Sequence, residues 1–268
     1  MVRIGCAGWQ LRGANDTFDG DGTHLARYSR IFTAVEINSS HYRPHRRATY
    51  QRWADSVPDD FRFSVKMPRI ITHENRLADC EEFRDLFLEQ VEGLGAKLGT
   101  VLVQLPPTLE FDPDVAPAFF AGLRERFADG GIVVEPRHAS WFRNEVEVML
   151  AEARVGRVVP DPLPVDLAAE PGGWQGTVYF RLHGSPEMYH SLYDGPFLKA
   201  TAERLRWHEE SGSYVWCIFD NTVKQGAISN ALQMLRLLEA SLSEASSRPP
   251  EHPPLPSAPS LPPAVPLL

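Results

Sequence analysis

The sequence predicts one α/β domain built as an eight-stranded (β/α)8 TIM-type barrel, and three observations support this prediction. Short apolar runs alternate with amphipathic stretches along most of the chain, which is typical of parallel strands joined by helical crossovers. There are eight such runs, the number that closes a barrel. No glycine-rich dinucleotide loop follows any of them, which disfavours an open doubly wound sheet. The 268 residues suffice for one core, because barrels of about 250 residues are commonly one domain.

The predicted strands are short apolar runs in which β-branched and aromatic residues recur. In chain order they cover Arg3–Ala7, Ala34–Ile37, Arg62–Lys66, Thr100–Gln104, Ile132–Glu135, Arg157–Pro160, Val178–Leu182 and Tyr214–Phe219. The predicted helices follow the helical spacing of apolar residues. They cover Thr23–Phe32, Thr49–Asp55, Glu81–Leu94, Asp114–Phe127, Trp141–Ala153, Pro196–Glu210 and Gln225–Ala240. The interval Pro162–Thr177 carries proline and glycine and is predicted to be a loop.

Apolar and polar residues alternate along several of the predicted strands. Parallel strands that are covered on both faces usually read as apolar throughout. A polar face is therefore informative, and we expect it to point into the barrel and its mouth, at the strand C-termini where barrel active sites lie. The polar positions concerned are Glu36, Asn38, Arg62, Ser64, Lys66, Tyr179, Arg181 and His183.

From about Ser241 the composition changes. Nine of the chain's 23 prolines lie between Pro249 and Pro266. A segment of this kind cannot bury a core. The sequence thus predicts a barrel domain over residues 1–240 and a disordered, proline-rich tail over residues 241–268.

Charge and cysteine content restrict the partners and the compartment. The net charge of −8 gives no general affinity for polyanions, so a nucleic-acid partner has no support from it. Cys6, Cys80 and Cys217 are odd in number and form no C-x-x-C pair, which favours a reducing compartment. Neither a signal-peptide-like start nor an apolar run of 18 residues occurs. We expect a cytoplasmic protein with no membrane partner; the oligomeric state stays open.

Two carboxylates are the first candidates for chemistry. Glu36 and Glu135 end predicted strands on the face assigned to the interior, where an ionised carboxylate is costly unless it is paired or ligated. Two carboxylates can divide into an acid and a base when their environments differ. We interpret both as catalytic candidates, with His138 and His183 as proton shuttles. The alternative interpretation is a structural lattice of ion pairs.

Cations at the same mouth indicate an anionic ligand. Lys66, Arg137 and Arg181 lie at or near strand ends, and arginine presents a planar fork to carboxylate or phosphate. The aromatic side chains in the adjoining loops suit a sugar or a nucleobase. The predicted substrate-binding residues are Trp9, Asn38, Tyr42, Lys66, His73, Gln104, Arg137, Trp141, Asp161, Arg181 and Asn221. We therefore predict a small polar substrate, either anionic or sugar-like.

Three classes of function stay open at this point. The first is an enzyme for a small polar substrate, which requires no cofactor. The second is a metal-dependent phosphodiesterase or nucleic-acid-processing barrel, since imidazole plus carboxylate suits a divalent metal if His73, His138 and His183 converge. The neighbouring cations oppose a metal ion, and no metal ligand is assigned. The third is a non-catalytic binding or scaffold barrel.

A series of motifs resembles the YecE-like TIM-barrel family, a domain of unknown function. In chain order they are Gly5-Cys6-Ala7-Gly8-Trp9, Val35–Tyr42, Phe61–Lys66, Thr72-His73, Lys97–Gly99, Gln104–Pro107, Glu135–Trp141, Arg181–Gly184, Phe219–Thr222 and Asn230-Ala231. The resemblance implies an eight-stranded barrel with a polar pocket at the strand C-termini, and it implies no reaction. Cys6-Ala7 replace the family's usual Thr-Ser, and Asp220 replaces the first Asn of its Phe-Asn-Asn.

Overall fold

The computed structural model describes residues 1–11 and 15–247, and it is an α/β fold with parallel sheets. One sheet has the order β1-β10-β9-β7, and the other has the order β2-β3-β4-β5-β6-β8. The strands are β1 (Arg3–Cys6), β2 (Ala34–Ile37), β3 (Arg62–Lys66), β4 (Leu98–Gln104), β5 (Gly131–Glu135), β6 (Val155–Arg157), β7 (Val159–Asp161), β8 (Gly172–Gly173), β9 (Thr177–Leu182) and β10 (Tyr214–Phe219). Every pairing between these strands is parallel except β6 with β8. Every predicted strand is present.

The two sheets are linked at both of their edges. A parallel bridge joins Ala7 to Glu36, and the amide of Gly8 donates to the carbonyl oxygen of Glu36 at 2.9 Å. At the other edge, the predicted strand Arg157–Pro160 is divided. Its first half, β6, pairs with β5, and its second half, β7, pairs with β9. Pro160 has no amide hydrogen to donate to β5, which explains why the chain changes partner there.

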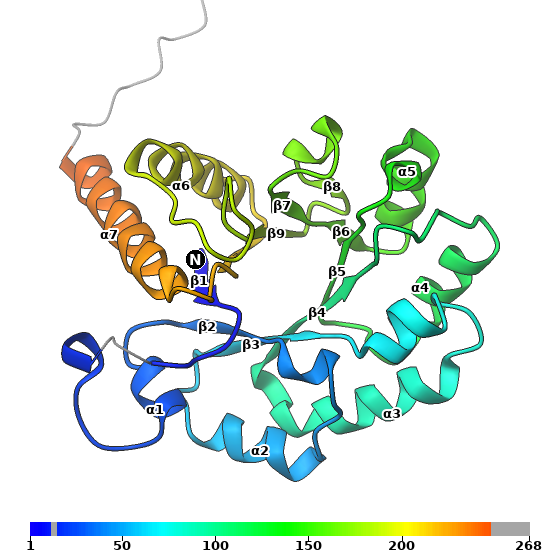
Figure 1. Cartoon of the computed structure of the whole chain (residues 1–268), viewed down its shortest axis with the longest axis horizontal. Helices are drawn as coiled ribbons and strands as arrows, with labels where there is room; N and C mark the ends of the chain where they lie inside the picture. The colour runs from blue at the N-terminus through cyan, green and yellow to red at the C-terminus, as the bar shows by residue number, and fades with distance from the viewer. Residues whose placement is uncertain (12–14, 248–268) are drawn as a thin grey trace, which may run out of the picture.

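The α-helices connect the strands and lie around the outside of them (Figure 1). They are α1 (His24–Tyr28), α2 (Arg47–Asp55), α3 (Glu81–Val91), α4 (Val115–Arg126), α5 (Asn144–Glu152), α6 (Gly195–Glu210) and α7 (Gly226–Ser247). Single-turn helices precede or follow several of them: η1 (Asn15–Phe18), η2 (Ser39–His41), η3 (Ile70–Glu74), η4 (Glu92–Lys97), η5 (Ala139–Phe142) and η6 (Asp166–Ala169). The Asp194 carboxylate caps α6 by accepting from the amide of Phe197 at 2.9 Å.

Three helix predictions need correction. The fifth helix begins at Asn144 and not at Trp141, which lies in the separate turn η5. The first helix ends at Tyr28 rather than Phe32. The last helix continues to Ser247, past the predicted end at Ala240, because the first proline that would end it is Pro249. The rest of the predicted tail lies outside the described residues. Between β7 and β9 the chain forms η6 and β8 and no α-helix, as predicted.

Two apolar clusters occupy the two faces of the strands. The larger contains the apolar residues of the helices together with strand residues such as Val35, Phe63 and Phe180. The smaller lies on the opposite strand face and comprises Ala34, Leu102, Val133, Val158, Tyr179, Trp216 and Ile218. Because strand side chains alternate, the residue two positions further on shares the face of the smaller cluster. Glu36, Glu135 and Arg181 occupy such positions, so a polar layer covers this cluster toward the strand C-termini.

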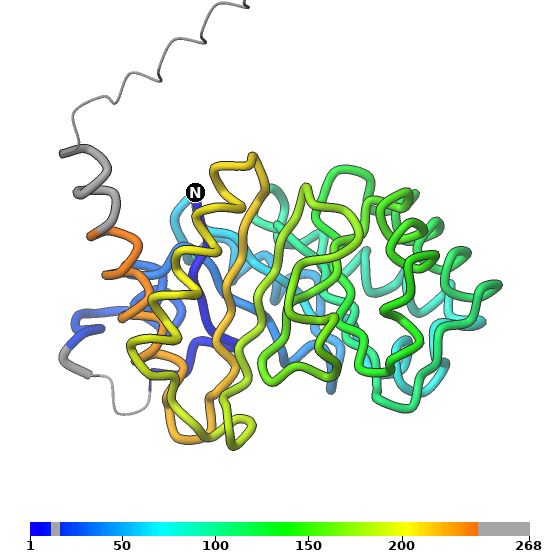
Figure 2. The backbone as a smooth tube through the Cα atoms, turned by 90° about the horizontal axis from the view of Figure 1, so that it is seen from above, coloured from blue at the N-terminus to red at the C-terminus, as the bar shows by residue number. Residues whose placement is uncertain are grey.

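The first strand and the last helix are neighbours. Figure 2 shows β1 and α7 side by side, and the two elements are in contact. The helix α6 packs against both α7 and β10. Among the described helices, none combines the length and the apolar character needed to cross a lipid bilayer.

Candidate functional site

Arg181 lies at the centre of the polar layer. Its guanidinium on β9 is 1% exposed and binds Glu36 through two nitrogens, at 3.0 and 2.8 Å. It also forms ion pairs with Asp220 at 2.9 Å and with Glu135 at 3.3 Å. Burial lowers the pKa of Arg181, but Asp220, Glu36 and Glu135 outweigh it and hold the pKa well above its ordinary value. Arg181 is therefore a permanent cation that ties three strand ends together.

Glu135 ends β5 and is fully buried beside two guanidinium groups. Its Oε1 accepts a short hydrogen bond from Arg137, and its Oε2 faces Arg181. Burial raises the pKa of Glu135, but Arg137, Arg181 and His183 together hold it well below its usual range. The two guanidinium groups and His183 thus favour the ionised form of Glu135.

His183 is enclosed by this cluster. Its Nδ1 lies 3.1 Å from Asp220 Oδ2, and its Nε2 lies 2.8 Å from Arg137 Nη2. Nε2 also lies 3.1 Å from Glu135 Oε1. Burial raises the pKa of Asp220, whereas Arg181, His183 and Lys66 lower it by more. Both ring nitrogens of His183 are therefore engaged by protein groups.

Glu36 is held equally firmly. The hydroxyl of Tyr179 lies 2.9 Å from Glu36 Oε2 and 2.9 Å from Ser64 Oγ. Burial and the charge of Glu36 raise the pKa of Tyr179 well above its usual value, so the phenol stays protonated. With Tyr179 and Arg181 both bound to it, Glu36 is placed as an anchor of the lattice.

Lys66 differs from every other charged residue of the cluster. Its side chain at the end of β3 is 5% exposed, yet within the described part of the chain its ammonium forms neither an ion pair within 4 Å nor a hydrogen bond. The backbone oxygen of Lys66 accepts from Ser40 Oγ at 2.6 Å, which fixes the strand end. Burial and the charge of Arg181 lower the pKa of Lys66 to about 8, although Glu36, Glu135 and Asp220 oppose this.

Two imidazoles lie near Lys66. His41 Nδ1 lies 2.8 Å from the carbonyl oxygen of Met67, and the rings of His41 and His73 are 4.9 Å apart in an edge-to-face contact. Burial and Lys66 lower the pKa of His41 to about 4. Burial and Lys66 also lower the pKa of His73. Both rings are neutral at neutral pH, so Lys66 is the cation among them.

The predicted aromatic residues do not form a single ring around the cluster. Trp9 packs edge-on against Trp53 at 5.0 Å. Tyr42 is 71% exposed and lies beside His41 at 5.1 Å. Trp141 is buried, and its indole nitrogen donates to the carbonyl oxygen of Leu109 at 3.0 Å. Trp141 is one of the predicted substrate-binding residues, but its side chain is buried and packs in the core.

Three of the four remaining predicted residues form local hydrogen bonds, and Asn38 does not. Gln104 Nε2 donates to the carbonyl of the next residue at 2.8 Å. Asp161 accepts from the hydroxyl of Tyr193 at 2.8 Å. The Asn221 amide donates to Ser191 and to Asn230. Asn38 immediately precedes η2, and its Oδ1 is buried with no hydrogen-bond partner among the described residues.

The three predicted histidines do not converge. His183 contacts Glu135 and Asp220, and His73 lies beside His41. His138 instead faces Ser140 Oγ at 2.9 Å. Over residues 1–11 and 15–247, no group of three or more His, Cys, Asp or Glu side chains is arranged to hold a metal ion. The residues present do not fit the metal centre that the second class of function requires.

Sequence reasoning did not assign several members of the site. Asp220 and Tyr179 complete the lattice, and Ser64 and His41 support its edge. Tyr189, at φ 67°, brings its ring edge-on to His183 at 5.7 Å. Tyr179 and Ser64 could have been predicted as site residues, because both share the polar strand face with Arg181 and Lys66. Asp220 could have been predicted because it replaces an asparagine that is usual in the family.

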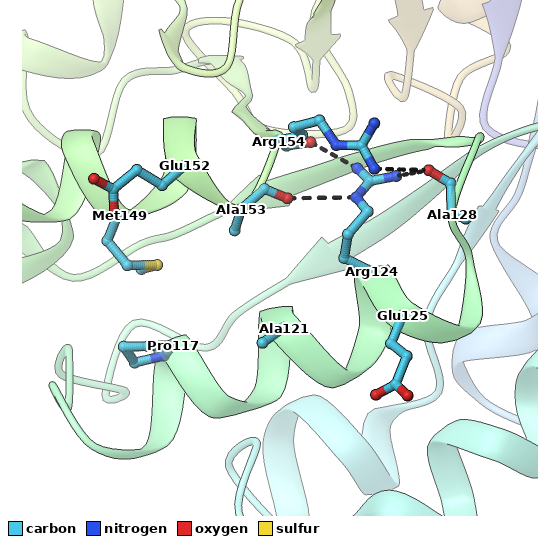
Figure 3. A pocket seen from close by; sticks show the side chains of 9 residues that line it. All are labelled: Pro117, Ala121, Arg124, Glu125, Ala128, Met149, Glu152, Ala153 and Arg154. Atoms are coloured by element: carbon cyan, nitrogen blue, oxygen red, sulfur yellow. Dashed lines mark hydrogen bonds between the residues drawn. The ribbon is translucent and has the colours of Figure 1, made fainter.

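A separate hollow of about 600 Å³ lies between α4 and α5, away from the polar layer (Figure 3). Its most prominent polar group, Arg124, is occupied by the protein itself. The guanidinium donates to the carbonyl oxygens of Ala153, Arg154 and Ala128. These bonds close the C-terminal ends of α4 and α5, so Arg124 has a structural role there.

Comparison with other proteins places the chain among relatives whose descriptions name no activity. The UPF0759 protein YecE of Escherichia coli K12 is 32% identical over 151 residues, which cover 54% of this chain and 55% of that protein. The chain thus spans about half the length of this relative. The UPF0759 protein YunF of Bacillus subtilis is 24% identical over 92% of this chain and 98% of its own length.

Solved structures of the same family share the fold. A DUF72 family protein from Thermotoga maritima superposes with a TM-score of 0.72 at 26% identity, over 89% of this chain and 99% of that chain. One from Enterococcus faecalis gives a TM-score of 0.76 at 24% identity, over 89% of this chain and 96% of that chain. The family model described as "Protein of unknown function DUF72" matches residues 3–255. The chain therefore belongs to the DUF72 family, as the YecE-like motifs of its sequence predict.

Proposed function

We propose that this protein is an enzyme for a small polar substrate that carries a carboxylate or a phosphate, and that Lys66 binds or protonates that substrate. One observation carries the proposal: the Lys66 side chain is largely buried, and its ammonium has no carboxylate within 4 Å among the described residues, although three carboxylates lie in the same layer. A buried cation is costly unless it is paired. An anionic ligand would supply the missing partner.

The roles within the cluster follow from which groups are already engaged. Three of the four predicted catalytic residues, Glu36, Glu135 and His183, use their polar atoms on one another and on Arg181, whereas the fourth, His138, faces Ser140. They are better suited to hold the site rigid than to exchange protons with a substrate. Lys66, with a pKa of about 8, is close to neutrality and can act as a general base or acid. Arg137, which is near the surface of the cluster, is the second cation available to an anion.

The strand pairings support a closed (β/α)8 barrel as the scaffold. The two sheets meet at Ala7–Glu36 on one side and through the divided strand β6/β7 on the other. Barrel active sites lie at the C-terminal ends of the strands, where Lys66 and the lattice are found. We also propose a cytoplasmic location, supported by the three free, buried cysteines. Fractionation of cells that express the tagged chain tests it.

The decisive experiment replaces the ammonium while keeping the side chain's length. Lys66→Met is compared with the parent by calorimetry against a panel of sugar phosphates, dicarboxylates and phosphate monoesters. We expect an anion that binds the parent to bind Lys66→Met at least about tenfold more weakly, because a charge-assisted contact is lost. Lys199→Met, which removes an exposed lysine of α6, is the matched control. An anion that binds parent and Lys66→Met alike contradicts the proposal.

A non-catalytic binding protein is the second candidate, and the saturation of the lattice favours it. Glu36, Glu135, Asp220 and His183 all have protein partners. Among the described charged residues of this layer, Lys66 has no ion-pair partner and Arg137 Nε has no hydrogen-bond partner, so these two cations are left for a ligand. Turnover of the bound compound separates the two candidates. If the parent binds an anion through Lys66 and never converts it, the protein is a binder.

A further inference from the structure

A second hollow, of about 320 Å³, lies at the opposite ends of the strands from Lys66. The residues around it include the first residues of four strands, namely Arg3, Arg62, Thr177 and Tyr214. The volume is at the small end of the range for ligand sites, which runs from about 300 to 1,000 Å³. The hollow shares no residue with the charged lattice, so an inference about it does not depend on the proposed function.

Two arginines at this hollow are left without carboxylate partners. Nη1 of Arg3 donates to the carbonyl oxygens of Thr33 and Asp60, at 3.3 and 3.0 Å. Nη1 of Arg62 donates to the carbonyl oxygens of Asp59 and Phe61, at 2.6 and 2.9 Å. Among the described residues, neither guanidinium has a carboxylate within 4 Å, and Nη2 of each forms no hydrogen bond. Both therefore keep donors for an anion.

The two guanidinium groups are close enough to affect each other. Burial and the charge of Arg62 lower the pKa of Arg3, while Asp60 partly opposes them. Asp129 is the carboxylate that lines the hollow, and it is exposed. The net charge that a ligand meets at the lining is thus positive.

Aromatic rings form the wall of the hollow. Trp174, Tyr214 and Trp216 line it, and Tyr214 is 73% exposed although it begins a strand. Trp216 is buried beside Gly99, where a Cβ would lie 2.7 Å from the indole ring. Arg3 lies 5.9 Å from the centre of the same ring. Aromatic rings beside guanidinium groups without carboxylate partners suit a planar anionic ligand.

The floor holds a hydroxyl that the protein does not use. Thr100 Oγ1 is buried and has no hydrogen-bond partner among the described residues. Gly131 makes room for this hydroxyl, since a Cβ at Gly131 would lie 2.8 Å from Oγ1. A buried hydroxyl without a partner costs free energy unless a ligand or water completes it.

We propose that this hollow is a second ligand site, which binds a small aromatic ring carrying a phosphate or carboxylate group. The ring lies against Trp174, Tyr214 and Trp216, and the anionic group is bound by Arg3 and Arg62. Thr100 donates a hydrogen bond to the bound molecule. The site lies at the N-terminal ends of the strands, where barrel enzymes do not place catalytic residues. Its role is therefore ligand binding without chemistry.

The test is calorimetric titration of the full chain with phenyl phosphate, and separately with inorganic phosphate and with phenol. We expect phenyl phosphate to bind at least about tenfold more tightly than either fragment, because only the whole molecule engages both the rings and the guanidinium groups. Benzoate reports whether a carboxylate serves as well as a phosphate. Equal affinity for inorganic phosphate and phenyl phosphate would overturn the aromatic part of the proposal.

Variants locate the bound molecule. Arg62→Gln should weaken phenyl phosphate about tenfold, and Thr100→Val should weaken it severalfold without lowering the melting temperature. Asp129→Asn should strengthen it, since a repelling charge is removed. Arg52→Gln, at an exposed arginine of α2, is the matched control and should bind as the parent does.

Measurements on a chain that carries Lys66→Met distinguish binding at this hollow from binding at the C-terminal ends of the strands. We expect Arg62→Gln to weaken the binding of phenyl phosphate in the Lys66→Met background by the same factor as in the parent. Binding that disappears in Lys66→Met but is unchanged in Arg62→Gln would overturn the proposal, as would the absence of binding at millimolar concentration.

Discussion

The two ends of the strands use polar residues in opposite ways. At the C-terminal end, Arg181 is bound by three carboxylates, and these carboxylates are also contacted by Tyr179, Arg137 and His183. At the N-terminal end, Arg3 and Arg62 have no carboxylate within 4 Å among the described residues, and Thr100 Oγ1 has no partner. Charge density alone therefore does not mark a binding site. Polar groups that the fold leaves incomplete are more informative, namely Lys66 at one end and Thr100 at the other.

Removal of the central cation should have the largest effect. Arg181→Met leaves Glu36, Glu135 and Asp220 buried without their shared partner. Breaking a buried ion pair typically costs about 3–5 kcal/mol, so we expect a loss of that order in the free energy of unfolding. Denaturant unfolding measures it. The control Arg47→Gln breaks an exposed pair with Glu92 and should cost less than about 1 kcal/mol. Equal losses in the two variants would show that the lattice is not structural.

Acid should act on the same end of the molecule. The pKa of Glu135 in the folded protein lies well below its ordinary value of 4.5, because Arg137, Arg181 and His183 outweigh burial. The stability that this carboxylate contributes is therefore present above pH 4.5 and is lost as the pH falls through the folded pKa. Glu135→Gln should be less stable at pH 7 and should show a shallower loss below pH 4.5 than the parent. Parallel stability curves would contradict this assignment.

Lys66 should behave in the opposite way to Arg181. Its pKa is lowered from 10.5 to about 8, so the folded state disfavours its charge. Stability should rise as the pH increases from 8 toward 10.5, because the unfolded chain holds the proton longer. Lys66→Met should be more stable than the parent at pH 7, by roughly 1–3 kcal/mol, and should lose that rise. If Lys66→Met is destabilised as Arg181→Met is, then Lys66 belongs to the lattice.

The smallest expected difference between the two ends of the strands concerns the stability contributions of two buried hydroxyls. Ser64 Oγ bonds to Tyr179, whereas Thr100 Oγ1 has no partner in the described structure. Ser64→Ala should cost about 1 kcal/mol in the free energy of unfolding, and Thr100→Val should be neutral or slightly stabilising. Thermal unfolding of the unliganded variants measures both. A loss at Thr100 equal to that at Ser64 would mean that its hydroxyl is satisfied, and would remove one support for the second ligand site.

Much of the fold could be predicted because it rests on local pattern. Runs such as Val35–Ile37 and Val178–Leu182 contain the β-branched and aromatic residues that favour strands. Because apolar and polar residues alternate in these runs, Glu36 and Arg181 were predicted to lie on the polar face. The predictions were wrong where contacts with distant segments determine the structure. The strand around Pro160 pairs with two different neighbours, and the indole of Trp141 is buried with a hydrogen bond to the carbonyl oxygen of Leu109.

The residue pattern predicted where the strands lie along the chain, which polar residues of several strands share a face, and the family. The pairing of the strands, and which of those polar residues have partners, depend on the tertiary structure. Arg181, Glu135 and Lys66 look equally reactive along the chain, yet the first two neutralise each other and the third is left alone. The reason is physical: alternation within a strand is a local property of the backbone, whereas the state of a buried charge depends on groups that come from other strands.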